Sequence, residues 1–153
     1  MKKANHNFPA APRNLRLIID GEVMEKLKAE EQCSLIIEVD AFPSGMLYEN
    51  PNGGAPILSF LLLAVEAESG FILCTKLYEV GATVEDSWER VPGFLFTELA
   101  RHSVRPAQIN VKTPWLEMLL HPPCDALSIE IKRVAQLPSL REARKLLRQM
   151  MRK

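Results

Sequence analysis

The stretch from Pro56 to Glu79 constrains the fold of this chain more than any other part of it. Apolar residues run almost unbroken from Ile57 to Val65. The run is too short for a membrane-spanning helix, which needs about 20 apolar residues. We interpret it as a strand buried on both faces, with a turn at Glu68-Ser69-Gly70 and a second strand that alternates from Phe71 onward. Such a buried strand requires structural layers above and below it.

The segments around this hairpin alternate between strand and helix patterns. The apolar positions and the Pro and Gly breaks predict strands over 15–19, 33–42, 105–112 and 127–134, and helices over 22–31, 83–102, 114–120 and 139–151. Pro92-Gly93 should kink or divide the second helix. Pro43 to Pro56 is expected to be a loop. Thr83, Thr113 and Ser139 are the predicted N-caps of the last three helices.

The strand predicted over 33–42 places its acidic residues on one face. Because side chains alternate along a strand, we expect one face to carry Leu35, Ile37, Val39 and Ala41. The other face should carry Ile36, Glu38, Asp40 and Phe42.

The composition indicates one ordinary globular unit. The content of 47% apolar and 25% charged residues is typical of globular domains, and the length fits one domain. We expect a flexible arm over 1–12 and a single α/β domain over 13–153, with its core over 33–153. Three widely spaced cysteines offer no zinc motif, and no apolar segment follows Lys2-Lys3. We therefore expect the cytoplasm as the compartment.

Charge is unevenly distributed along the chain. Formal net charge is zero, but residues 132–153 hold eight basic residues and one acidic residue. The basic residues of the last predicted helix recur at spacings of three and four, which places them in one stripe: Arg141, Arg144, Lys145, Arg148 and Arg152. Two interpretations stay open. The stripe is either a contact surface for phosphate or an acidic partner, or a solvated face whose cations complement the helix dipole.

Four motifs resemble those of a bacterial domain family of unknown function. They are Val39-Asp40-Ala41-Phe42, Leu62 to Gly70, Pro106 to Val111, and Leu137-Pro138-Ser139-Leu140. The order of elements from Cys33 also resembles the ribonuclease H-like fold of integrases and transposases. The resemblance implies a mixed central sheet, with an antiparallel meander followed by parallel strands, and helices on both faces.

The resemblance also implies where metal-dependent chemistry would lie. Nucleases of this fold gather acidic side chains around two divalent cations. Asp40 matches the acid of the first strand, Glu38 shares its face, and Glu142 is the candidate on the final helix. Lys112-Thr113 stands where the second acid is expected.

The sequence favours a non-catalytic ribonuclease H-like module for binding or assembly, with no cofactor. A nuclease with a reduced acidic site, which would need Mg²⁺ or Mn²⁺, is an alternative. Nucleic-acid binding through the basic C-terminal helix is another. The expected partner is a protein or a nucleic acid rather than a membrane, and the chain could form an oligomer.

Overall fold

The computed structural model describes residues 17–79 and 84–151. The elements follow the order α1 (Gly21–Ala29), β1 (Ile36–Tyr48), β2 (Ile57–Glu66), β3 (Ile72–Glu79), α2 (Val84–Arg101), β4 (Gln108–Val111), α3 (Pro114–Ala126), β5 (Glu130–Arg133) and α4 (Pro138–Met151). None of the helices in this described part is long and apolar enough to cross a membrane.

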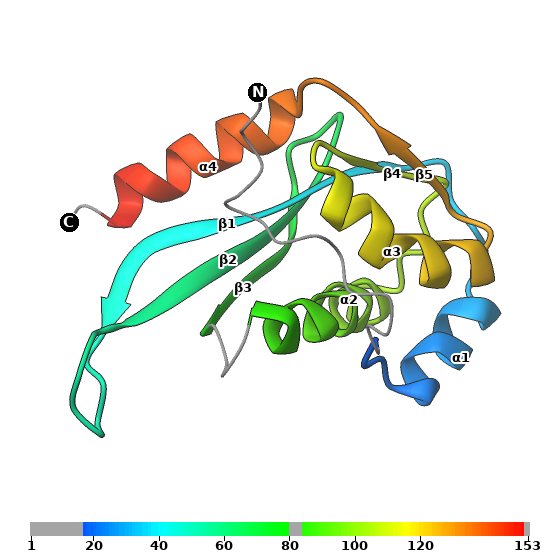
Figure 1. Cartoon of the computed structure of the whole chain (residues 1–153). Coiled ribbons are helices and arrows are strands. Elements are labelled where there is room, and N and C mark those ends of the chain that lie inside the picture. Colours follow the sequence, from blue (N-terminus) through cyan, green and yellow to red (C-terminus); the bar gives the residue numbers. More distant parts are fainter. Residues whose placement is uncertain (1–16, 80–83, 152–153) are drawn as a thin grey trace, which may run out of the picture.

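The strands form one mixed sheet in the order β3-β2-β1-β4-β5. β1, β2 and β3 pair as an antiparallel meander, whereas β4 and β5 join on the other side of β1 as parallel strands. The helices α1, α2 and α3 lie on one face of this sheet, and α4 runs across the other (Figure 1). The predicted α/β fold class, a mixed sheet with an antiparallel meander followed by parallel strands and with helices on both faces, is confirmed.

Two apolar layers explain why the β2 sequence is so uniformly apolar. Leu62 and Ala64 belong to the larger core between the sheet and helices α1 to α3. Leu61, Leu63 and Val65 point to the other face, where they pack with the buried side chains of α4. Alternate residues therefore face different layers, and the prediction of a strand buried on both sides is confirmed.

The β2–β3 hairpin closes on hydrogen bonds made by an acidic side chain. The carboxylate of Glu66 accepts bonds from the backbone N–H groups of Glu68 and Ser69, at 2.9 Å each. Gly70 has φ of 77°, which glycine adopts without steric cost. A bulge follows, since Ala64 pairs with Cys74 while Val65 pairs with Ile72. The strict alternation predicted for β3 is therefore wrong at Leu73, which is buried beside Cys74.

The predictions for two segments near the sheet are wrong. Residues 17–19 form no strand, and the Ile18 N–H donates instead to the Glu89 carbonyl of α2 at 2.9 Å. β1 continues to Tyr48, so the predicted loop over 43–56 begins only after that residue. The long buried β2 supplies the pairing partners, and a register shift after Pro43 accommodates the proline. Because β4 pairs with β1 only as far as Val39, Pro43 lies on an open edge where its missing N–H costs no hydrogen bond.

Prolines inside helices account for the next differences. Pro92 lies within the continuous α2, so the helix is not divided there. α3 runs to Ala126 through Pro122 and Pro123, beyond the predicted end at residue 120. These prolines are tolerated because tertiary packing outweighs propensity, as buried Pro123 and Cys124 indicate.

The predicted N-caps have different outcomes. Thr113 occupies the N-cap position of α3, but its hydroxyl makes no capping bond. Ser139 lies inside the first turn of α4 and donates its hydroxyl to the Ala67 carbonyl, so its capping role is wrong. Thr83 and the arm over 1–12 lie outside the described residues.

Candidate anion-binding surface beside the last helix

The first turn of α4 is capped by a residue from the middle of β1. Glu38 is 4% exposed, and its Oε1 accepts a hydrogen bond from the Leu140 backbone N–H at 2.8 Å. The first N–H groups of a helix have no partner within the helix, and a negative charge there also suits the helix dipole. The carboxylate of Glu38 is therefore engaged in attaching α4 to the sheet.

Asp40 lies two residues further along the same face of β1. Its Oδ1 accepts a hydrogen bond from the Ala41 backbone N–H at 2.9 Å. Burial raises the pKa of the Asp40 carboxyl, although this bond and the nearby positive charges of Arg144 and Lys112 act in the opposite direction. Asp40 is thus a partly desolvated carboxylate with cations as its nearest charged neighbours.

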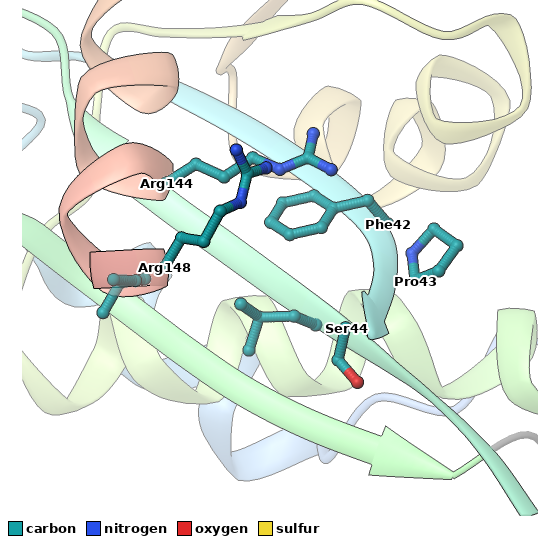
Figure 2. Close-up of a pocket in the computed structure, with 7 residues that line it drawn as sticks. Phe42, Pro43, Ser44, Arg144 and Arg148 are labelled. Atoms are coloured by element: carbon teal, nitrogen blue, oxygen red, sulfur yellow. The ribbon is translucent and has the colours of Figure 1, made fainter. Parts of the chain in front are cut away.

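Arg144 of α4 lies over the ring of Phe42, which follows Asp40 on the same face of β1. The Arg144 guanidinium carbon lies 3.8 Å from the centroid of the Phe42 ring. Arg148, one turn later, extends towards the same ring (Figure 2). A guanidinium over an aromatic face is attracted by the ring and remains able to donate hydrogen bonds from its edge. The pair presents a flat cationic surface between α4 and β1.

Two adjoining hollows share Arg144 as a wall. The first, of about 120 Å³, lies where the parallel pairing of β1 with β4 ends and is lined by Asp40, Lys112, Gln136, Leu137, Leu140, Arg141 and Arg144. The second, of about 90 Å³, is lined by Phe42, Pro43, Ser44, Leu61, Arg144, Leu147 and Arg148 (Figure 2). The first hollow is polar and mostly cationic, whereas apolar side chains form most of the second.

The basic residues of α4 form no ion pair with a described carboxylate, although Asp40 lines the same hollow as Arg141 and Arg144. Among the side chains that the structure describes, the ion pairs within 4.0 Å involve Lys26, Lys28, Arg101 and Arg133, and none involves a basic residue of α4. Arg141, Lys145 and Arg148 are exposed, and Arg144 is partly buried. The predicted stripe is therefore present as far as Arg148, while Arg152 lies outside the described residues.

The three candidate acids do not converge. Glu38 and Asp40 share a face of β1, as the alternation predicted. Glu142 is exposed and lines a different hollow, between α4 and the β2–β3 turn, together with Gly70 and Leu146. Within the described residues, no group of three or more His, Cys, Asp or Glu side chains is placed to hold a metal ion.

Sequence reasoning missed three members of the surface. Lys112 was noted as a departure from the nuclease pattern rather than as a binding residue, and Gln136 and Phe42 were not considered as site residues. The position of Lys112 directly after a strand predicted to be parallel was the available signal, because the carboxyl ends of parallel strands meet at one edge of a sheet. The Arg144–Phe42 contact joins residues about 100 positions apart, and no local pattern predicts it.

The fold and the surface define an α/β domain with a mixed five-stranded sheet and a cationic surface beside its last helix. A family model described as a domain of unknown function, DUF6930, matches residues 23–148, so the chain belongs to this family. The search of curated proteins found no match.

A solved structure also resembles the chain. It is a chain in the cryo-electron microscopy structure of a simian T-cell lymphotropic virus intasome in complex with the PP2A regulatory subunit B56 gamma. The sequence identity is 14% and the TM-score is 0.49. The match covers 78% of this chain and 42% of that chain.

Proposed function

We propose that this domain is a non-catalytic binding module that holds the phosphate backbone of a nucleic acid along the basic flank of α4. The observation that carries the proposal is the set of cations along this flank without an ion-pair partner among the described side chains: Arg141, Arg144, Lys145 and Arg148. If these cations served only to neutralise acidic groups of the same protein, they would be expected to form ion pairs with carboxylates. Phosphates neutralised by such side chains release condensed counterions, which drives binding.

A nucleic acid fits this surface better than an acidic protein for two reasons. The cations follow one helix flank at spacings of three and four, which gives a linear track of charge. The Arg144 guanidinium, which lies over the buried Phe42 ring, adds a flat surface beside that track, and guanidinium planes are among the groups that unpaired bases stack on. The surface therefore suits a single strand.

The nuclease alternative rests on Asp40, which keeps the position of the first acid at the end of the parallel part of β1. Two observations weigh against it. The Glu38 carboxylate already accepts the Leu140 N–H, and Lys112 and Arg144 are the charges nearest to Asp40. A divalent cation bound at Asp40 would be repelled by both of these side chains. Incubation of a nicked or single-stranded substrate with Mg²⁺ or Mn²⁺ is expected to give no cleavage, and cleavage that Asp40→Asn abolishes would support the nuclease instead.

Binding is measured by fluorescence anisotropy with a labelled single-stranded oligonucleotide at low salt. We expect saturable binding that weakens by about tenfold or more in the double variant Lys145→Gln/Arg148→Gln, because each lost phosphate contact removes counterion release. These two side chains are exposed, so the substitutions should leave the packing of α4 intact.

The matched control is Lys26→Gln/Lys28→Gln on α1, on the opposite face of the sheet (Figure 1). It removes the same charge from the protein but not from the proposed surface. Equal loss of affinity in the two double variants would reduce the effect to net charge and contradict a localised site. No binding by the wild-type protein at low salt would reject the proposed function.

A further inference from the structure

We propose that the bound strand is engaged at one end, and that a terminal phosphate monoester occupies the hollow between the first turns of α4 and the point where the parallel pairing of β1 with β4 ends. This inference rests on the proposed function and specifies which part of the nucleic acid the module recognises. It is carried by the position, the charge and the size of the hollow.

The position is the place where ligands enter sheets of this kind. β1 pairs in parallel with β4 only as far as Val39 and Val111, and Asp40 and Lys112 are the next residue on each strand. β1 continues to Tyr48 along β2, whereas β4 ends at Val111, so among the described strands β1 has no partner on the β4 side from Asp40 onward. Ligands of open α/β sheets bind outside the carboxyl ends of parallel strands, and Lys112 stands at that end of β4.

The charge of the hollow matches a dianion. Lys112, Arg141 and Arg144 supply three positive charges, and Asp40 supplies one negative charge, so the lining carries a net charge of about +2. A phosphate monoester carries a charge of about −1.5 to −2 near pH 7. An internal phosphodiester carries about −1. A strand end with a monoester therefore neutralises the lining more completely than a phosphate within a strand.

The polar groups of the hollow suit the oxygens of a phosphate. Arginine donates in a planar fork and lysine as a point charge, and the Gln136 side chain adds amide donors. Hydrogen bonds between such cations and phosphate oxygens are shorter and about twice as strong as neutral ones. Asp40 can accept a bond from the hydroxyl of a singly protonated phosphate, which limits its repulsion of the ligand.

The size of the hollow accommodates a phosphate group. Its volume of about 120 Å³ is well above the roughly 10–15 Å³ that one water molecule needs by the same measure. The nucleoside attached to that phosphate then lies towards the neighbouring hollow of about 90 Å³ beside Phe42. Arg144 separates the two hollows, so its guanidinium edge can face the phosphate while its plane lies on the ring (Figure 2).

The test compares three forms of one short oligonucleotide, carrying a 5′-phosphate, a 3′-phosphate or hydroxyls at both ends, with the wild-type protein at fixed salt. We expect one of the phosphorylated forms to bind about tenfold more tightly than the hydroxyl form, the effect of additional hydrogen bonds to a charged group. Which end is preferred identifies the polarity of the bound strand.

Lys112→Gln should remove this preference, so that the phosphorylated and hydroxyl forms bind this variant with equal affinity. Lys132→Gln, on the neighbouring β5, is the matched control and should keep the preference, since this exposed lysine does not line the hollow. Equal binding of all three forms by the wild type would overturn the inference and leave the proposed function intact. Absence of binding to any form rejects the proposed function itself, and the inference with it.

Discussion

The cap that Glu38 provides for α4 gives a prediction whose size follows from the structure. In Glu38→Ala, the Leu140 N–H loses its acceptor in a buried place, and leaving such a donor unpaired costs about 1–3 kcal/mol. The loss of a helix cap costs about 0.5–2 kcal/mol, which describes the same interaction and is not additional. We therefore expect a decrease of about 1–3 kcal/mol in the free energy of unfolding. For a chain of this length, each kcal/mol lowers Tm by about 2–4 °C, so Tm should fall by about 2–12 °C.

The conservative variant Glu38→Gln separates the contribution of the hydrogen bond from that of the negative charge. The amide oxygen can still accept the Leu140 N–H, but the negative charge at the helix N-terminus is lost. We expect a loss of about 1 kcal/mol, within the range for charges at helix ends in partly buried geometry. The assay is urea unfolding followed by circular dichroism, combined with hydrogen exchange at the first turn of α4, where the protection should decrease first.

Glu142→Gln is the control, because it removes an exposed carboxylate from the same helix without touching the cap. A surface substitution of this kind should change stability by about 0.5 kcal/mol or less. The reasoning is refuted if Glu38→Ala is no more destabilising than Glu142→Gln, or if the lost protection lies outside α4. It is also refuted if Mg²⁺ raises Tm of the wild type but not of Glu38→Gln, since Glu38 would then be a metal ligand.

Further predictions concern packing, pH and thiol reactivity. Gly93→Ala should destabilise the fold by about 1–3 kcal/mol in urea unfolding, because its Cβ would clash with the backbone carbonyl oxygen of Ile18. Gly21→Ala meets nothing within 4 Å and should not destabilise the fold. Burial raises the pKa of Asp40, so ionisation of its carboxyl lowers the stability of the fold as pH rises. The stability of Asp40→Asn relative to wild type should therefore increase between about pH 3 and pH 7 in thermal unfolding. A difference in stability between the two proteins that stays constant over this range would contradict the raised pKa. Burial raises the pKa of Cys74 and Cys124 to about 12, so a thiol reagent at pH 8 should label both only after unfolding, and rapid labelling of the native protein would contradict their burial.

The sequence predicted those features whose physical cause is local. The β2–β3 hairpin follows from one continuous apolar run and a Gly turn, and the amphipathic α4 follows from its three- and four-residue spacing. The face of β1 that carries Glu38, Asp40 and Phe42 followed from simple alternation. These features need no knowledge of what packs against them.

The remaining features depend on contacts between distant segments. β1 extends past Pro43 because β2 offers pairing partners there, and α3 passes through Pro122 and Pro123 because its neighbours bury that turn. The capping of α4 joins Glu38 and Leu140, which are 102 positions apart. Glu38, which shares a face of β1 with the acid that the nuclease resemblance singled out, is therefore engaged in a hydrogen bond that no local pattern specifies.

The same separation explains the incomplete prediction of the candidate site. The basic residues of α4 were recognisable as a stripe, but their surroundings were not. Lys112 reaches the stripe through the parallel pairing of β4 with β1, and Phe42 reaches it through the packing of α4 on the sheet. These contacts between distant segments create the two hollows, which the charged helix alone would not have.

The salt dependence of oligonucleotide binding tests the central claim most directly. The basic flank of α4 offers four described cations, and each phosphate contact of a single strand contributes about −0.7 to the slope of log K against log salt concentration. We predict a slope of about −2 to −3 for the wild type, and a slope reduced by about 1.4 in Lys145→Gln/Arg148→Gln. A slope near zero, or the same slope in both proteins, would contradict a phosphate-binding role for this helix.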